Sequence, residues 1–438
     1  MGPSVSRHRA QGASRLSVAS WCLYDFANSS FTTLVVTFVY ATWFTKAMAP
    51  DEVAGTGRWS WAVTISSLLI ALLAPVVGAH ADRHAWRRRW FAGLTAVTIT
   101  FAALLAFLPP PHWLAALAVF VIANVAYELS QALYNSFLPG LVEKSKAGRV
   151  SGIAWGLGYV GGLLSLVVGL VVCVQRWGVF ATWLGTEAGW NIRATNLVVA
   201  LWFLLFSIPA LLWLVEPAPP DPEATASLRR LGESVRRLAR YRQAMRLLVA
   251  RLIYNDGLVT IFAFGGIYAA GTFSMSMDEI IAFGIALNLS AGLGAIAFGM
   301  IDDWIGGKKV ILISLAGLIC AAILAATAST KTELWVAGIL IGLLVGPNQS
   351  ASRSLMARFV PAPRSAEMFG LFAFSGKLTS FAGPLLLGRL TEFFHSQRVG
   401  VSSVLLFFVV GGALLLTVDE QDGRHFAELE QRRLQGEG

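Results

Sequence analysis

Two short stretches decide the fold: GAHADRHAWRRR at residues 78–89 and GMIDDWIGGKK at residues 299–309. Each contains Gly-x-x-x-Asp followed by a basic pair, and each follows a long apolar run. The same signal at corresponding places in the two halves of a chain predicts internal duplication. We expect each stretch to form a tight loop whose aspartate caps or pairs with a neighbouring element.

The composition predicts that the runs around these loops lie in a membrane. Apolar residues make up 56% of the 438 residues and charged residues 13%, against roughly 45–50% and 25% in soluble domains. The apolar runs are about as long as the ~20 residues that a helix needs to cross the hydrocarbon layer. Because backbone groups find no water there, the runs predict helices, and the expected fold class is an all-α membrane protein.

Hydropathy and helix breakers predict about twelve spans. They are expected at residues 20–44, 59–79, 90–108, 113–138, 150–174, 195–215, 246–270, 278–301, 309–329, 333–357, 367–388 and 400–418. This spacing predicts two six-helix bundles joined by a linker. The expected regions are an N-terminal segment at 1–19, a bundle at 20–215, a linker at 216–245, a bundle at 246–418 and a tail at 419–438.

Basic residues gather in alternate loops. Apart from the two motif loops, they include Lys144, Lys146, Arg149 and seven arginines from Arg229 to Arg246. This bias predicts a multi-pass protein with both termini in the cytoplasm. The linker also carries an apolar stripe surrounded by arginines, which favours a surface helix on anionic membrane lipid, with a regulatory docking site as the alternative. The stripe consists of Leu228, Leu231, Val235 and Leu238.

Polar residues inside the spans are organised. Asp25, Asn28, Ser29 and Thr32 share one helical face of the first span. Such groups are costly in lipid and therefore indicate function. The candidates for binding a substrate or a proton are Asp25, Asn28, Glu128, Gln131, Tyr254, Asn255, Asp256, Gln349, Arg353 and Lys377.

Three roles remain open for the charged candidates. Asp25, Glu128 or Asp256 could carry a proton, and Arg353 or Lys377 could hold an anionic group. Alternatively, the pairs lock helices or form a gate. Asp25, Glu128 and Arg353 lie in the inner half of their spans, which fits a gate as well as substrate contact. Asp256 and Lys377 lie nearer mid-membrane, where a binding site is expected.

The duplicated loops resemble the signature loop of the major facilitator superfamily. Further segments resemble a narrower branch, the autophagy-related vacuole amino-acid effluxers and their bacterial relatives. These segments are WCLYDFANS at 21–29, YNSFLP at 134–139, GRVSG at 148–152, GYVGG at 158–162, YNDG at 254–257, QSASRS at 349–354, AEMFG at 366–370 and SGK at 375–377.

The resemblance implies a major facilitator fold in which the first, fourth, seventh and tenth spans line a cavity. It also implies gating loops, formed by Gly78, Asp82, Arg83, Arg87, Gly299, Asp303 and Lys308. It further implies export of neutral amino acids by a proton-coupled, alternating-access transporter in a bacterial inner membrane. Drug or sugar-like efflux, or a receptor or scaffold on the same fold, are the alternatives.

Other functions are not indicated. We find no nucleotide-binding loop or nucleophile motif and expect no enzyme and no cofactor. His80 and His84 lie one turn apart without a third ligand, so no metal site is expected. The net charge of +9 is explained by membrane topology rather than by nucleic acid. The expected partners are a small solute and membrane lipid, and the expected state is a monomer.

Overall fold

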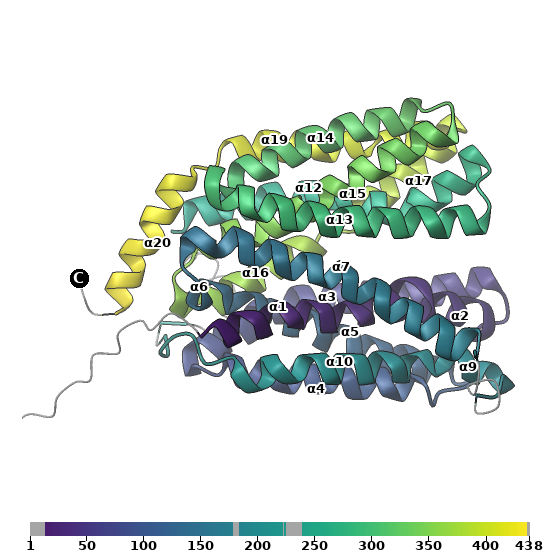
Figure 1. Ribbon diagram of the computed structural model, residues 1–438, viewed down its shortest axis with the longest axis horizontal. Helices are drawn as coiled ribbons and strands as arrows, with labels where there is room; N and C mark the ends of the chain where they lie inside the picture. Colours follow the sequence, from purple (N-terminus) through teal and green to yellow (C-terminus); the bar gives the residue numbers. More distant parts are fainter. Residues whose placement is uncertain (1–13, 178–183, 222, 225–238, 436–438) are drawn as a thin grey trace, which may run out of the picture.

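The computed structural model describes residues 14–177, 184–221, 223–224 and 239–435, in which every regular element is helical. The helices form two bundles that lie side by side (Figure 1). The first bundle contains α1 (Arg15–Ser30), η1 (Phe31–Phe38), α2 (Tyr40–Ala47), α3 (Glu52–His84), α4 (Arg87–Leu105), α5 (Trp113–Ser136), α6 (Leu138–Leu141), η2 (Lys144–Lys146), α7 (Ala147–Gly169), η3 (Leu170–Val174), η4 (Glu187–Gly189), α9 (Trp190–Arg193) and α10 (Thr195–Trp213). The second contains α12 (Arg242–Phe273), α13 (Met277–Ile305), α14 (Gly307–Thr327), α15 (Lys331–Phe359), η6 (Ala362–Arg364), α16 (Ser365–Lys377), α17 (Ala382–Phe394), α18 (Gln397–Ser402) and α19 (Val404–Leu416), and α20 (Glu420–Leu434) follows it.

Each bundle has six spans. Ten segments among the described residues are long and apolar enough to cross a membrane. The continuous run of α1, η1 and α2 and the helix α4, which begins with three arginines, complete the two sets of six. The expected all-α membrane fold with about twelve spans is confirmed.

Several predicted spans are irregular along their length. The first changes to π-helical winding over Phe31–Phe38, as the fifth does over Leu170–Val174, and the eleventh breaks at residues 378–381 between α16 and α17. Pro384 accounts for the break in the eleventh span. It is the third residue of α17, where backbone N–H groups lack intrahelical partners, whereas in a continuous helix its ring would clash with the preceding turn. Lys377 therefore ends a helix instead of lying inside one.

The two bundles share an end that we call the basic end, because the loops after α3, before α7 and before α14 bring their lysines and arginines there. Helix α20 lies at this end (Figure 1). The opposite end, where α2 and α17 lie, is called the far end. Helix α10 ends at Trp213 and α12 begins at Arg242. The amphipathic helix predicted around Leu228 falls outside the described residues.

Two helix pairs make the most extensive contacts between the bundles: α3 packs along α16, and α7 packs along α13. We call them the α3/α16 seam and the α7/α13 seam. The motif glycines make both possible, since a Cβ at Gly78 would collide with the backbone of Ala366, and one at Gly299 with that of Gly148. Small residues allow helices to touch backbone to backbone. The duplicated motif therefore lies at the contact between the bundles.

Candidate functional site: the closed basic end and the central cluster

Asp82 closes the α3/α16 seam. Its carboxylate accepts hydrogen bonds from the backbone N–H groups of Ala366 and Glu367, at 3.1 and 2.8 Å, in the first turn of α16. Carboxylates are favourable there because they satisfy free N–H groups and complement the helix dipole. Arg87 donates to Asp82 through Nε at 2.7 Å and to the Ala362 carbonyl through Nη2 at 2.6 Å. Asp82 and Arg87 thus reach across to the second bundle.

Asp303 repeats this arrangement at the α7/α13 seam. It accepts hydrogen bonds from the backbone N–H groups of Gly148 and Arg149, at 2.8 and 3.2 Å, in the first turn of α7. Arg358, near the end of α15, donates to it at 3.1 Å. The two motif aspartates therefore cap equivalent helices of opposite bundles, as expected from a duplicated fold.

The other basic motif residues are placed differently. Arg83 is exposed and forms no hydrogen bond or ion pair with another residue of the described part of the chain. Lys308 donates through Nζ to the carbonyls of Leu416 and Val418, at 3.0 and 2.5 Å, inside the second bundle. Arg87 and Arg358 are thus the cations that support the motif aspartates.

Three charged residues that the sequence did not single out complete the basic end. Asp302, Arg358 and Arg364 are each at most 1% exposed. Arg358 Nη1 lies 2.5 Å from Asp302 Oδ1, and Arg358 Nε donates to the Lys144 carbonyl at 3.0 Å. In sequence these arginines resemble any other cations at the cytoplasmic ends of spans. The doubled aspartate at 302–303 was the only available signal.

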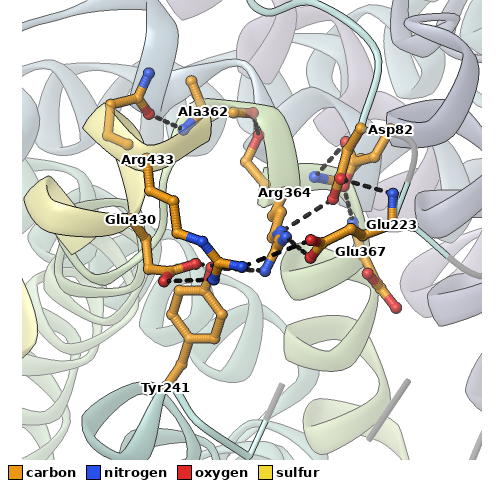
Figure 2. A network of polar contacts seen from close by, with 12 residues as sticks. Asp82, Glu223, Tyr241, Ala362, Arg364, Glu367, Glu430 and Arg433 are labelled. Carbon is orange, nitrogen blue, oxygen red and sulfur yellow. Dashed lines mark hydrogen bonds and ion pairs between the residues drawn. The ribbon is translucent and has the colours of Figure 1, made fainter. Parts of the chain in front are cut away.

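Arg364 is the centre of a network that we call the Arg364 hub (Figure 2). Its side chain is fully buried and lies 2.9 Å from Asp221 and 2.5 Å from Glu223, both in the linker. It also lies 3.5 Å from Glu430 of α20. Arg433 of α20 pairs with Glu223 at 3.7 Å. The linker and the C-terminal helix therefore converge on the loop before α16.

Deeper in the molecule, Arg353 of α15 binds the first bundle. It donates to Asp25 at 2.8 Å, to the Ser151 hydroxyl and carbonyl at 2.9 and 2.8 Å, and to Asn135 at 3.2 Å. The guanidinium lies 4.7 Å from the Trp21 ring. The side chains of Arg353 and Asp25 are only 3% and 9% exposed. The structure thus brings two predicted residues together in what we call the Asp25–Arg353 seal.

A series of hydrogen bonds leads from this seal toward the centre. Asn28 donates to Asp25 at 3.3 Å, Tyr127 donates to Asn28 at 3.3 Å, and Gln131 donates to Tyr127 at 3.0 Å. The Oε1 atom of Gln131 is buried and has no partner among the described residues. Gln131 lies one helical turn from Glu128, so the series ends beside a second charged group.

That group belongs to a central cluster, which consists of Glu128, Gln131, Arg251, Asn255 and Lys377. Glu128 and Lys377 form an ion pair between the bundles, with 2.6 Å between Oε1 and Nζ and side-chain exposures of 20% and 30%. Arg251 interacts electrostatically with Glu128. Asn255 donates to the Gly376 carbonyl, next to Lys377, at 3.2 Å. Arg251, a cation inside the seventh span, was not among the predicted candidates.

The side chains of the remaining candidates form no hydrogen bond or ion pair with the cluster residues within the described ranges. The Tyr254 hydroxyl is hydrogen-bonded to Ser352 at 2.8 Å inside the second bundle. Asp256 is 2% exposed, and no ion pair involves it within the described ranges. Gln349 is partly exposed and has no hydrogen-bond partner in the same ranges.

The contacts between the bundles are confined to one side of the molecule. Among the described residues, the hydrogen bonds and ion pairs that join the bundles lie at the basic end, at the seal or at the Glu128–Lys377 pair. None lies closer to the far end. The basic end is therefore closed, and the central cluster holds the last polar contact between the bundles.

Comparison with known proteins agrees with this architecture. A family model described as "Vacuole effluxer Atg22 like" matches residues 59–428. The chain belongs to this family. The Atg22-like family is the branch that the sequence motifs resembled, so that prediction is confirmed.

Two relatives show how far the Atg22-like similarity extends. The MFS-type transporter YxiO of Bacillus subtilis (strain 168) is 26% identical over 408 residues, which cover 92% of this chain and 94% of that protein. Autophagy-related protein 22 of Yarrowia lipolytica (strain CLIB 122 / E 150) is 27% identical over 344 residues, 70% of this chain and 56% of that protein. The Atg22-like chain is thus an MFS-type transporter and an integral, multi-pass membrane protein.

Solved structures confirm the major facilitator fold of this Atg22-like chain. The human organic anion transporter MFSD10 (TETRAN) gives a TM-score of 0.74 at 16% identity, covering 92% of this chain and 99% of that one. The major facilitator transporter FucP, in the outward conformation, gives 0.72 at 12% identity, covering 92% and 100%. At these identities the likeness concerns the fold alone.

Proposed function

We propose that this transporter moves a small solute by alternating access and that its basic end faces the cytoplasm. The observation that carries the proposal is the closed basic end, with its two equivalent seams and the seal above them. Two similar bundles that rock about a central site close one end while the other opens. The surplus of lysine and arginine at the basic end supports the cytoplasmic orientation of that end and of both termini.

The solute we propose is a neutral amino acid, leucine-like or aromatic, exported from the cytoplasm. Two observations support this choice. The family description names an effluxer, and the central cluster offers a carboxylate beside two cations, as a zwitterion requires. The similarity to YxiO over most of both chains favours a bacterial inner membrane as the location.

The proposed coupling ion is a proton, and Asp256 is its proposed carrier. Asp25 and Glu128 are each tied to a cation, so protonating either would break an ion pair. Asp256 is buried without such a pair within the described residues, so its protonation would break none. A carboxyl that gains and loses a proton during transport requires this freedom.

Flux measurements in proteoliposomes test the proposal. We expect an imposed proton gradient to drive the flux of labelled leucine, and we expect Asp256→Asn to abolish the dependence on pH. Asp278→Asn is the matched control, because Asp278 is an exposed carboxylate in the first turn of α13. Flux of labelled drugs or sugars without leucine flux would overturn the amino-acid assignment. Unchanged pH dependence in Asp256→Asn would remove Asp256 from the coupling role.

A further inference from the structure

The charges of the central cluster do not balance. Arg251 and Lys377 are cations, whereas Glu128 is the only carboxylate among the five residues of the cluster. Lys377 is paired with Glu128, and Arg251 has no carboxylate within ion-pair distance among the described residues. A cation that is partly withdrawn from water and lacks a counter-charge is unfavourable unless an anion joins it. The cluster therefore carries one positive charge in excess, which a negative group could neutralise.

The donors of Arg251 show where that group would bind. Only Nη1 is used, donating to the Phe372 carbonyl at 2.9 Å and to the Ser375 hydroxyl at 3.1 Å. The Nε and Nη2 donors have no acceptor in the described part of the chain. Neither atom is among the buried polar atoms that lack a partner there, so both keep some exposed surface. The Phe372 ring lies 3.7 Å from the guanidinium and restrains its plane. A restrained guanidinium with two unused donors is suited to bind a carboxylate through both oxygens.

Arg353 provides the contrast within the same molecule. All three of its donor nitrogens bind protein acceptors, and Asp25 neutralises its charge. It is also nearly inaccessible, with a side chain 3% exposed. Arg353 is thus committed to holding the bundles together, while Arg251 retains donors for a ligand.

The Glu128–Lys377 pair supplies the opposite charge. Both side chains are partly exposed, unlike those of the seal. Lys377 is the last residue of α16, directly before the break at 378–381, so its side chain can move with little disturbance of a helix. An ammonium group that replaces Lys377 at Glu128 would thus find the partly exposed Glu128 carboxylate in place.

We infer that Arg251 binds the carboxylate of the transported solute, and that Lys377 occupies the ammonium position at Glu128 until the solute's own ammonium replaces it. This inference rests on the proposed function, since it specifies how the same site would recognise a zwitterion. No bond is made or broken, because one ammonium replaces another at the same carboxylate. The exchange also removes the Glu128–Lys377 ion pair between the bundles. Binding of the solute would therefore make it easier for the two bundles to separate.

Binding to the full-length protein in lipid nanodiscs tests the inference, with titration calorimetry as the readout. Three probes separate the charges: leucine carries both groups, leucinamide only the ammonium, and 4-methylpentanoate only the carboxylate. We expect Arg251→Met to weaken leucine binding about 10- to 100-fold, the range of charged bidentate hydrogen bonds, and to leave leucinamide binding within about threefold. Arg251→Lys should retain an intermediate affinity, because it keeps the charge without the fork.

Lys377→Met provides a second, independent test of the inference. If Lys377 competes for Glu128, its removal should tighten the binding of leucine and of leucinamide by about threefold or more, whereas Glu128→Gln should weaken both. A purely structural lysine would give unchanged or weaker binding. Arg398→Met is the matched control, because Arg398 also donates to carbonyls and lies 5.5 Å from a phenylalanine ring, but in α18 at the far end.

The two proposals fail in different ways. If the wild-type protein neither binds nor moves leucine, the proposed function is wrong and this inference falls with it. If the wild-type protein binds leucine, and Arg251→Met binds it equally well or Lys377→Met weakens it, the inference alone is overturned.

Discussion

The two seams that join the bundles are built alike but reinforced differently. In both, a motif aspartate caps the first turn of a helix in the opposite bundle. At the α3/α16 seam, the Asp82 side chain is fully buried, and its cation Arg87 also lies 3.9 Å from the Glu216 carboxylate. At the α7/α13 seam, Arg358 binds Asp302 as well as Asp303, and Asp303 is 17% exposed.

This comparison distinguishes the features that belong to the internal repeat from the features that occur only once in the chain. The capping aspartate and its glycine recur because they belong to the repeated unit. The Arg364 hub has no counterpart in the repeat, since it uses the linker and α20, which occur once in the chain. The hub strengthens the α3/α16 seam, whereas the α7/α13 seam relies on a second aspartate and on Glu420 of α20, which lies 3.7 Å from Arg358. The two seams should therefore respond differently to the loss of one charge.

The largest effect should come from Arg364→Ala. This change leaves Asp221, which is fully buried, without its cation, and breaking one side of a buried ion pair costs about 3–5 kcal/mol. We expect the closed basic end to open. Spin labels can be attached at Arg83→Cys and Lys309→Cys in a chain without its native cysteines. The distance between the two labels, measured by double electron–electron resonance, should become longer in Arg364→Ala. Both positions are exposed and lie on different bundles.

Two companion variants show whether the effect belongs to the buried charge. Asp221→Ala combined with Arg364→Ala should recover most of the closed population, because no unpaired carboxylate remains at that position. Arg389→Ala should change nothing, since Arg389 and its partner Glu392 are both 74% exposed. An unchanged distance distribution in Arg364→Ala would show that the hub does not hold the basic end closed.

A smaller effect should distinguish the seams directly. Asp82→Asn removes the charge that Arg87 needs, whereas Asp303→Asn leaves Arg358 with Asp302. We expect a loss of closed-state stability of about 2–3 kcal/mol for Asp82→Asn and about 1 kcal/mol for Asp303→Asn. The same pair of spin labels measures both. Equal shifts for the two variants would contradict the idea that the second aspartate protects the α7/α13 seam.

Sequence reasoning could predict the repeated part of this arrangement and not the rest. The Gly-x-x-x-Asp spacing is local, so the loops, the bundles and the fold follow from pattern and hydropathy. Asp25 and Arg353 stood out because charges inside spans are costly, but their pairing joins positions 328 residues apart. Arg364 resembled an ordinary cytoplasmic cation, because its burial depends on the distant linker and α20. The break after Lys377 is signalled by Pro384, which disfavours a continuous helix there.

The smallest effect concerns Glu223, at the exposed edge of the hub. Partial burial acts to raise the pKa of Glu223, but the guanidinium groups of Arg364, Arg433 and Arg240 together outweigh this, so the pKa lies below its usual value. A carboxyl with a lowered pKa in the closed state stabilises that state at neutral pH. This contribution is lost as the pH falls through the lowered pKa.

Acidification from about pH 7 to about pH 4 should therefore weaken the closed end slightly. Because the Glu223 side chain is 45% exposed and solvent screens its charge, the change should stay below about 1 kcal/mol. Other carboxyls titrate in the same range, so the informative quantity is the difference between the wild-type protein and Glu223→Gln. The variant should open slightly at neutral pH and respond less to acid. Identical pH responses would show that the linker's second carboxylate contributes nothing to closure.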